Sequence, residues 1–419
     1  MSTGTRFSDL YECGIDVEDP NGYCTGRYFP VILGSVLNNG RYRIMHKLGW
    51  GGFATVWMAR DNWRDSNVAL KVINMENNAQ EFKVLHHLQH SSVARDNADH
   101  PGRRSVVQLL DDFDLSVSHK CLVLPVMGMD LQTRMDAENG HRLRKKNAGS
   151  VARQVALGLD YLWKCGIAHG DLHSKNVLFT APAIPGLSED QIRSHFGQPV
   201  TGAVSRQDSQ QCPASMPSYL VRPISIRGND AEVKILDLGN AFFHDNPPTR
   251  LSNPWHVCAP ESLYDQPLNK FVDMWSMGCL LFELITGRTF MDSFLANRID
   301  MIRGLKGILG QPPLEWYNDL DDNVRITFDN TRIRNMGLVR YLQLNYNQDD
   351  SQLLDVDDEG EEILIEEYEK PSPEFTDTEL MALAGILSRL LSYNPQARGT
   401  PDILLKDLSY LGSKLHFAK

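Results

Sequence analysis

The sequence predicts an α+β fold with two lobes, a β-rich N-terminal lobe followed by a mainly helical C-terminal lobe. After Arg41, short β-branched and aromatic runs alternate with Gly, Asn and Asp turn signals, which is typical of strands. After Leu131 the chain changes to longer amphipathic or apolar segments that end on glycine, as helices do. We therefore expect an N-terminal extension at 1–40, an N-lobe at 41–127 and a C-lobe at 128–410.

Each predicted element of the N-lobe has its own local signal. The segments RYRIMHKLG, FATVWMARD and NVALKVINM predict three consecutive strands. The next segment, QEFKVLHHLQH, has apolar residues at helical spacing and predicts the first long helix. Two further strands are expected in VVQLLDDFDLS and KCLVLPVMG.

The C-lobe is predicted from two long helices and two insertions. AGSVARQVALGLDYLWKCG is amphipathic and ends at Gly166, whereas FVDMWSMGCLLFELITG is almost wholly apolar, ends at Gly287 and should be a buried central helix. Residues 180–230, rich in Pro, Ser, Gln and Gly, form one expected insertion. Residues 349–374 form an acidic one, which is either a solvated, flexible face or a docking segment for a basic peptide.

Bulk composition narrows the class of protein. The 419 residues are 42% hydrophobic and 23% charged, as in ordinary globular proteins. The net charge of −11 argues against direct nucleic-acid binding and is compatible with a basic protein substrate, although it also serves plain solubility. The seven cysteines form no CxxC pair, and neither a secretory signal nor a membrane-length apolar run is visible. We expect a monomer of the cytoplasm and nucleus with reduced thiols.

A glycine-rich hairpin and a strand lysine predict a phosphate-binding site. In LGWGGFATVW, residues 48–57, three glycines (Gly49, Gly51 and Gly52) allow the backbone to approach a ligand because no Cβ intervenes. Val56 follows as an apolar residue that could cover an adenine ring. Lys71, in VALK on the next strand, is well placed to meet phosphate oxygens.

Two later motifs supply a base and oxygen ligands for a metal. HGDLHSKN, residues 169–176, contains Asp171, which could accept a proton from a hydroxyl, and Asn176, whose amide oxygen could bind Mg²⁺. EVKILDLGNAFF ends a predicted strand at Asp237, a second oxygen ligand. A phosphate cradle, a lysine, a base and two metal ligands are the parts that phosphoryl transfer needs, and they occur here in order.

Together with APE at 259–261, DMWSMGC at 273–279 and NPQARGT at 394–400, these motifs resemble the signature set of eukaryotic protein kinases. The resemblance spans roughly residues 41–410. Within that family the chain is most similar to short, fungal-type SR-protein-specific kinases, through EDPNGYCTGRYFPVILGSVLNNGRY, KLGWGGFATVW, HPGRR and DLGNA. The resemblance implies the bilobal kinase fold, ATP and Mg²⁺ as cofactors, and Ser/Thr phosphorylation of proteins, with Arg/Ser-rich splicing factors as candidate substrates. The 180–230 insertion is similar in position to the family's spacer.

The resemblance also implies residue roles. Asp171 and Lys71 would be catalytic, Glu81 would pair with Lys71, and Asn176 and Asp237 would hold Mg²⁺. Nucleotide contacts would come from Leu48, Gly49, Trp50, Gly51, Gly52, Val56, Ala69, Lys71, Glu81, Leu124, Pro125 and Met127, with Leu124 as gatekeeper and 125–127 as hinge. Asp273 would anchor the catalytic loop, and Glu261 and Arg398 would form a buried ion pair.

Some positions depart from the family pattern. Gly170 replaces the Arg that answers a phosphorylated activation segment, which predicts activity without such phosphorylation; Thr249 and Ser252 are the acceptors in 240–258. His173 replaces a Lys and should be a weaker partner for phosphate. Cys258 stands where relatives often carry Arg, which puts Arg/Ser specificity in doubt.

Spacing raises one further question. Glu81 follows Lys71 by only ten residues, so either its helix is trimmed at the N-terminus or the ion pair forms poorly. These departures motivate an alternative, a pseudokinase scaffold that binds nucleotide or protein partners with little catalysis. A small-molecule phosphotransferase also carries HGDLHxxN-type loops, but the APE, DMWSMGC and Arg398 features favour a protein substrate.

Overall fold

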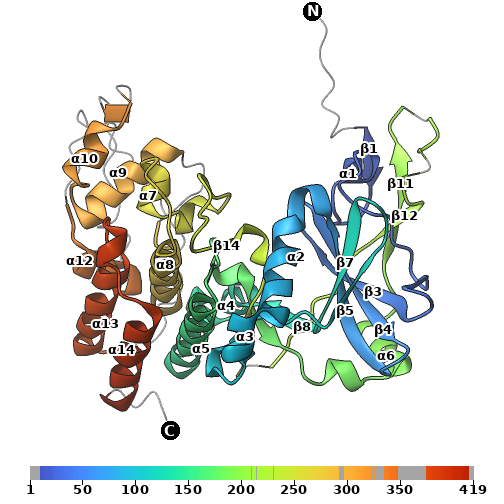
Figure 1. Cartoon of the computed structure of the whole chain (residues 1–419), viewed down its shortest axis with the longest axis horizontal. Coiled ribbons are helices and arrows are strands. Elements are labelled where there is room, and N and C mark those ends of the chain that lie inside the picture. Colours follow the sequence, from blue (N-terminus) through green and yellow to red (C-terminus); the bar gives the residue numbers. More distant parts are fainter. Residues whose placement is uncertain are drawn as a thin grey trace, which may run out of the picture. The chain divides into compact units, whose positions relative to one another are not determined.

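The computed structural model describes residues 10–208, 210–213, 215–229, 231–291, 297–321, 324–325, 335–347 and 374–414 (Figure 1). The chain divides into two compact units, and each is described by itself. The first unit comprises Met1–Ser91, Val107–Met129 and Phe179–Asn229; the second comprises Ser92–Val106, Asp130–Leu178 and Asp230–Lys419. The expected acidic insertion at 349–374 lies outside the described residues except for Glu374.

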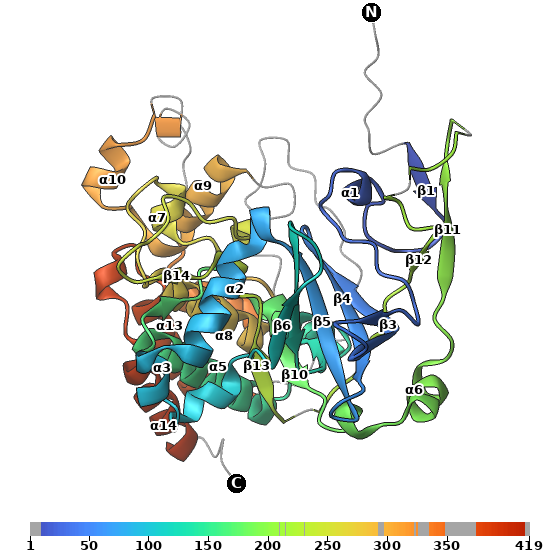
Figure 2. The ribbon, with the colours of Figure 1, turned by 45° about the vertical axis from the view of Figure 1, so that its right-hand side comes forward.

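The first unit is built on a six-stranded antiparallel sheet in the order β2-β3-β4-β5-β7-β6 (Figure 2). Its strands are β2 (Val36–Leu37), β3 (Tyr42–Trp50), β4 (Ala54–Asp61), β5 (Ser66–Asn74), β6 (Asp111–Asp114) and β7 (His119–Leu124). The three strands predicted between 41 and 75 are present, whereas VVQLLDDFDLS contributes only its second half. Helix α2 (Met75–His90) begins directly after β5, which is earlier than its apolar pattern indicated.

One face of this sheet is covered by chain segments from outside the predicted N-lobe. Alternate strand residues such as Trp57, Leu70 and Val123 form a core with Val31 of the N-terminal extension and Val221 of the 180–230 insertion. Period-two alternation puts these strand residues on one face. The extension and the insertion therefore bury the outer face of the sheet together.

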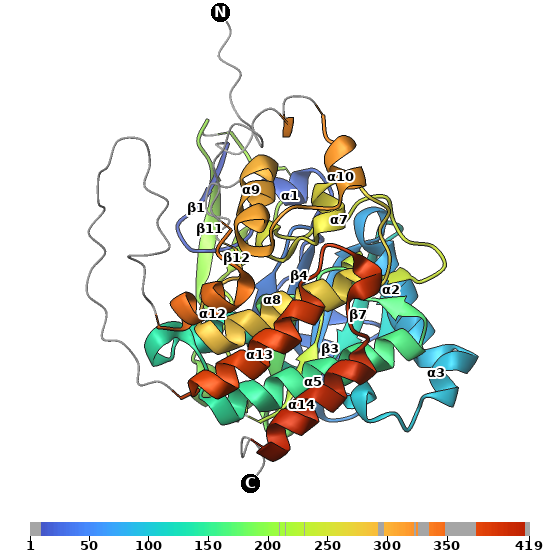
Figure 3. The same cartoon turned by 90° about the vertical axis from the view of Figure 1, so that its left-hand side faces the viewer.

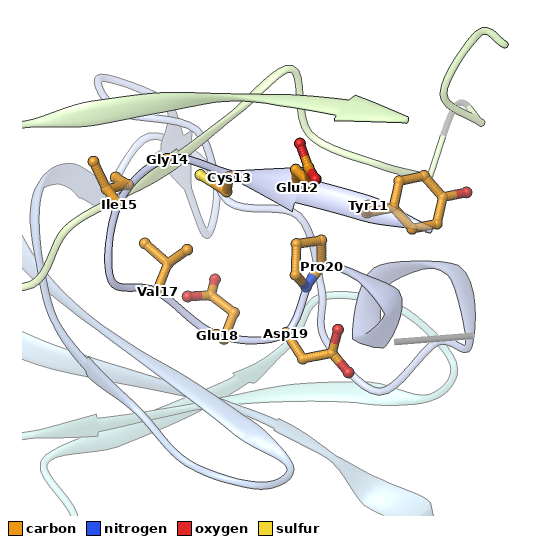
Figure 4. Close-up of a pocket in the computed structure, with 9 residues that line it drawn as sticks. All are labelled: Tyr11, Glu12, Cys13, Gly14, Ile15, Val17, Glu18, Asp19 and Pro20. Carbon is orange, nitrogen blue, oxygen red and sulfur yellow. The ribbon is translucent and has the colours of Figure 1, made fainter. Parts of the chain in front are cut away.

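The same two segments also pair directly. Strand β1 (Tyr11–Cys13) pairs with β11 (Thr201–Arg206), which pairs with β12 (Tyr219–Val221), in a second antiparallel sheet. Helix α1 (Asn21–Cys24) follows β1, and α6 (Glu189–Phe196) precedes β11. Figure 4 shows residues 11–20 bending around a small hollow, with the carboxylate of Glu18 on its wall.

This pairing corrects the division expected from the sequence, which placed 180–230 in the C-lobe. The insertion belongs to the first unit because its strands complete a sheet with β1 and its apolar residues join the core under β3–β5. Residues 92–106, by contrast, were expected in the N-lobe but belong to the second unit. There, a Cβ on Gly102 would lie 1.8 Å from the carbonyl oxygen of Leu157, which shows how closely this segment packs on helix α5 (Lys145–Lys164).

The second unit is mainly helical. Its longer helices are α5 (Lys145–Lys164), α8 (Val272–Thr286), α9 (Arg298–Leu309), α12 (Leu338–Asn347), α13 (Asp377–Leu390) and α14 (Pro401–Lys414). Its shorter ones are α3 (Ser92–Asp96), α4 (Leu131–Asp136), α7 (Pro260–Leu263) and α10 (Leu314–Asn318), with 3₁₀ turns at Pro101–Ser105, Asn139–His141, Ser174–Asn176, Leu238–Asn240, Trp255–Val257 and Pro395–Ala397. The short strands are β9 (Ile167–Ala168), β13 (Val233–Ile235) and β14 (Phe242–Phe243), while β8 (Met127–Asp130) and β10 (Val177–Thr180) each run from one unit into the other along the chain.

Helix α8 is the centre of the second unit, as its apolar sequence predicts. Every residue from Val272 to Thr286 is buried, and α8 packs against α5, α12 and α13 (Figure 3). It ends at Gly287 in the left-handed conformation, with φ of 75°. Within the described part of the chain, no helix combines the length and the apolar character that a membrane span requires.

Candidate active site

In the first unit, strand register gathers four predicted nucleotide contacts on one face of the sheet. Val56 on β4 is the partner of Lys71 on β5, and Ala69 on β5 is the partner of Leu124 on β7. Directly opposed residues of an antiparallel pair share a face, as do residues two apart on a strand. Val56, Ala69, Lys71 and Leu124 therefore form one surface, on the face opposite the Trp57 and Leu70 core.

Lys71 is held by the predicted partner. Its Nζ lies 2.7 Å from Oε1 of Glu81 on α2, and the Glu81 side chain is only 2% exposed. The short spacing is accommodated because Asn74 is both the last residue of β5 and the N-cap of α2, so no linker separates strand from helix. The ion pair therefore forms despite the short spacing between Lys71 and Glu81.

The glycine-rich turn and the hinge lie at the ends of these strands. Leu48, Gly49 and Trp50 finish β3, and Gly51 and Gly52 form the turn to β4. A Cβ added to any of the three glycines would meet no atom within 4 Å, so packing within the described chain does not demand glycine there. Leu124 ends β7, Pro125 follows, and Met127 begins β8. Glycines in an open turn fit the close approach of a phosphate chain.

In the second unit, the loop at 169–176 is anchored by Asp273 of α8. Oδ1 of Asp273 accepts from the Gly170 amide at 2.9 Å, and Oδ2 accepts from the His169 amide at 2.8 Å. The His169 ring continues the network, because its Nδ1 accepts from the Asp171 amide at 3.2 Å and its Nε2 donates to the Leu236 carbonyl at 2.9 Å. Two buried side chains, Asp273 and His169, thus fix the backbone amides of residues 169–171.

One carboxylate oxygen of Asp171 is held by a hydrogen bond, whereas the other is buried without one among the described residues. Oδ2 accepts from Asn240 Nδ2 at 3.1 Å, while buried Oδ1 has no hydrogen-bond partner among the described residues. Burial raises the pKa of Asp171, and the nearby charge of Asp237 raises it further, whereas His169 and the Asn240 hydrogen bond lower it. An oriented carboxylate with a free oxygen and a raised pKa can accept a proton from a hydroxyl.

Asn176 and Asp237 lie beside that carboxylate and fit an oxygen-loving cation. Nδ2 of Asn176 donates to the Asp171 carbonyl at 2.9 Å, which fixes the amide and leaves its oxygen as the ligand atom. Asp237 has φ of 60°, a strained conformation for a residue other than glycine. The described residues contain no cluster of three His, Cys, Asp or Glu side chains suited to a metal. A pair of hard oxygen ligands fits Mg²⁺, which takes its remaining ligands from phosphates and water.

His173 sits in the same loop and is neutral. Burial lowers its pKa to about 4, and the neighbouring His169 and His256 lower it as well. Its Nδ1 accepts from the Lys175 amide at 3.2 Å, and its Nε2 lies 3.7 Å from Asp171 Oδ1. The side chain therefore caps the turn at Ser174–Asn176, and it offers no positive charge at neutral pH.

Gly170 is required by the backbone. Its φ is +76°, and a Cβ there would lie 2.4 Å from the carbonyl oxygen of Asn240. A side chain at this position would displace Asn240, the residue that holds Asp171. The conformation of the loop therefore disfavours an Arg at position 170.

The remaining predicted structural residues are also placed. Glu261 and Arg398 form a two-point ion pair at 2.7 and 2.6 Å, with both side chains fully buried. Cys258 is buried, and burial raises the pKa of its thiol to about 12. A buried, protonated thiol is a packing residue here.

Two contributors were missed by sequence reasoning. Asn240 orients Asp171 and also donates to the Ser252 carbonyl at 3.3 Å, yet DLGNA carried no signal for that role beyond the resemblance. Glu283, on the apolar helix α8, lies 3.1 Å from the Ser174 hydroxyl, and burial raises its pKa to about 7. The available signal for Glu283 was its place as one of two acids, with Asp273, in an apolar helical run.

Comparison with known proteins gives the relatives of this chain. A family model described as "Protein kinase domain" matches residues 42–193 and 224–408. The serine/threonine-protein kinase SRPK of Physarum polycephalum is 31% identical over 309 residues, which are 67% of each chain. SRSF protein kinase 3 of Homo sapiens is 42% identical over 170 residues, and these cover 38% of this chain but only 29% of that protein.

Two more similarities concern a yeast protein and the fold. Protein kinase dsk1 of Schizosaccharomyces pombe is 28% identical over 264 residues, covering 61% of this chain and 46% of dsk1. The crystal structure of a kinase domain aligns with a TM-score of 0.58 at 18% identity, over 91% of this chain and 98% of that one. At that identity the structural match supports the fold alone. The α+β fold expected from the sequence is thereby confirmed.

Proposed function

Because the chain belongs to the protein kinase family, we propose that it is a serine/threonine kinase that transfers the γ-phosphoryl group of ATP to protein hydroxyls. The observation that carries this proposal is the Asp171 carboxylate, with one oxygen fixed by Asn240 and the other buried without a hydrogen-bond partner among the described residues. A scaffold without catalysis would have no need for a buried carboxylate oriented in this way, because burying an unpaired oxygen is unfavourable.

The proposed roles follow from the geometry within each unit. Lys71, fixed by Glu81, would neutralise phosphate oxygens of ATP, and the Val56–Ala69–Leu124 surface would cover the adenine. Asn176 and Asp237 would hold Mg²⁺, which neutralises phosphate charge when bound. Oδ1 of Asp171 would accept the proton of the attacking substrate hydroxyl. The hydroxyl oxygen would then form its new bond to the γ-phosphorus as the bond from that phosphorus to ADP breaks.

For the substrate, we propose Arg/Ser-rich proteins of the splicing-factor type. The relatives named SRPK and SRSF protein kinase motivate this assignment, and the net charge of −11 favours a basic partner. Such substrates place the protein in the cytoplasm and nucleus, where it would act as a monomer.

Constitutive activity follows from Gly170. An Arg at that position could bind a phosphate on the activation segment, but the loop excludes any side chain there. The segment is instead fixed by Asn240, which bridges Asp171 and the Ser252 carbonyl.

The test is phosphate transfer from labelled ATP and Mg²⁺ to an Arg/Ser peptide library. We expect Asp171→Asn to reduce kcat by about 10²-fold or more, because the base is removed while shape is kept. Asp96→Asn is the matched control, since Asp96 is exposed on α3 and should change nothing. Binding of ATP without transfer to any peptide by the unmodified protein would instead support the scaffold alternative, which neutral His173 favours.

A further inference from the structure

Residues 26–29 of the N-terminal extension contact the glycine-rich turn directly. Tyr28 donates its hydroxyl hydrogen to the Gly51 carbonyl at 2.9 Å. The guanidinium carbon of Arg27 lies 5.8 Å from the ring centroid of Phe53, which is 44% exposed at the tip of the same turn. Two neighbouring residues of the extension thus meet the turn at two points, one polar and one cation–π.

The same segment contacts the start of the helix that carries Glu81. Nδ2 of Asn74 donates to the Gly26 carbonyl at 2.7 Å, while Oδ1 of Asn74 caps α2 by accepting from the Glu76 amide at 2.8 Å. The ring of Phe29 lies 5.6 Å from that of His119 on β7. Residues 26–29 therefore connect the glycine-rich turn, the α2 N-terminus and β7 within the first unit.

Tyr28 is itself rigidly placed. The residue is 5% exposed, and its ring centroid lies 5.5 Å from that of Tyr23. A Cβ on Gly22 would lie 2.3 Å from the Tyr28 ring, so the glycine makes room for that ring. Burial raises the pKa of Tyr28, so the hydroxyl keeps the proton that it donates to Gly51.

The extension has an independent anchor on the sheet. Glu18 forms an ion pair with Lys47 of β3, and both side chains are fully buried. The Tyr23 hydroxyl donates to the same carboxylate. Because Lys47 lies on the strand that leads into the glycine-rich turn, Glu18 attaches the extension to that strand on the N-terminal side of residues 26–29.

We propose that residues 26–29 position the glycine-rich turn for nucleotide, with Tyr28 as the positioning residue acting through the Gly51 carbonyl. This inference rests on the proposed function, in which the turn receives the phosphates of ATP. A turn that is already held in one conformation loses less conformational entropy when it binds, so the affinity for nucleotide rises. The N-terminal extension is thereby part of the nucleotide site, although it precedes the first strand of the sheet.

The first test uses Tyr28→Phe in the full chain, with Tyr11→Phe as matched control. Tyr11 belongs to the same apolar cluster but its hydroxyl contacts Cys24. Tyr28→Phe removes one oxygen, and loss of one neutral hydrogen bond corresponds to a change of about three- to tenfold. We expect the Kd for a non-hydrolysable ATP analogue and the KM for ATP to rise by that factor, with the KM for peptide unchanged.

The second test is independent of catalysis. Hydrogen exchange of the backbone amides in 48–56, measured without nucleotide, should be faster in Tyr28→Phe and unchanged in Tyr11→Phe. Gly22→Ala should act in the same direction, because its methyl group displaces the Tyr28 ring. If Gly22→Ala fails to fold, Tyr28→Phe still decides the matter.

The outcomes separate this inference from the proposed function. Unchanged analogue affinity and unchanged exchange in Tyr28→Phe would overturn it, and so would equal changes in Tyr11→Phe, since these would indicate general loosening of the extension. If the unmodified protein binds no nucleotide, the proposed function fails, whereas faster exchange in Tyr28→Phe would still demonstrate the contact with the turn.

Discussion

The two units position their functional residues in different ways. In the first unit, Val56, Ala69 and Lys71 share a surface because regular strand register places them there. In the second unit, Asp171 lies on irregular backbone whose direction depends on buried side-chain hydrogen bonds from Asp273 and His169. Strand register is maintained by many backbone hydrogen bonds, whereas the conformation of the 169–176 loop depends on hydrogen bonds to a few side-chain atoms. Single substitutions should therefore damage the loop more than the sheet.

The largest effect is expected at Asp273. Asp273→Ala leaves the buried amides of His169 and Gly170 without acceptors, each at a cost of about 1–3 kcal/mol. The displaced loop should lower kcat by about 100-fold or more. Steady-state kinetics and thermal unfolding measure both effects. Asp273→Asn, which retains one acceptor, should be milder, and wild-type kcat in both variants would contradict the anchoring role.

Gly170 tests whether the loop tolerates any added volume. Gly170→Ala should destabilise the protein by about 3 kcal/mol, because the methyl group meets the Asn240 carbonyl as well as a positive φ. Gly166→Ala is the matched control, since Gly166 has the same φ of +76° but open space around it, and should cost about 1 kcal/mol. Urea denaturation gives both values. Equal costs would mean that the contact with Asn240 is easily relieved.

Glu283, whose carboxylate accepts a hydrogen bond from Ser174 of the 169–176 loop, should make the stability of the protein depend on pH. Its pKa in the folded protein is about 7, above the ordinary 4.5, so its contribution to stability is present below pH 4.5 and is lost as pH rises through 7. Glu283→Gln removes that loss and should be more stable than wild type by about 3 kcal/mol at pH 8 and by about 1 kcal/mol or less at pH 5. Urea denaturation at the two pH values checks this. Exposed Glu315→Gln should show no pH-dependent difference, and a pH-independent gain in Glu283→Gln would contradict the assignment.

Glu81 gives the corresponding test in the sheet. Glu81→Gln removes the charge that faces Lys71, but the strand still holds the lysine, so we expect a loss of only about tenfold in kcat/KM for ATP. Glu76→Gln, exposed in the first turn of the same helix, should leave the value unchanged. A loss of activity in Glu81→Gln as large as that in Asp273→Ala would show that the sheet is no more tolerant of single substitutions than the 169–176 loop.

The smallest effect is expected in the activation segment. The double substitution Thr249→Ala, Ser252→Ala should leave kcat within about twofold, because Asn240 contacts the main-chain carbonyl of Ser252, which alanine retains. Kinetics on protein before and after phosphatase treatment provides a second check. A large loss in either experiment would show that phosphorylation contributes to the active state.

The sequence allowed most of the sheet to be predicted, because alternation and turn residues are local signals. Lys71, Asp171, Asn176 and Asp237 could be proposed from motifs for the same reason. The grouping of 180–230 with the first unit could not, since the pairing of Tyr11 with Arg206 has no local signature. The role of Asn240 and the formation of the Lys71–Glu81 ion pair likewise depend on three-dimensional contacts, which spacing alone left undecided.

The pairing of β1 with β11 has a consequence for synthesis. The partner of Tyr11 is Arg206, and the Tyr11, Tyr23 and Tyr28 cluster is completed by Met216 and Leu220. During synthesis, residues 11–28 therefore cannot complete their sheet and cluster until residue 220 has been made. Contacts so distant in sequence form slowly and leave apolar surface exposed meanwhile. Within the first unit, this small sheet should thus close late, with Tyr28, which contacts the glycine-rich turn, among the last of its groups to be covered.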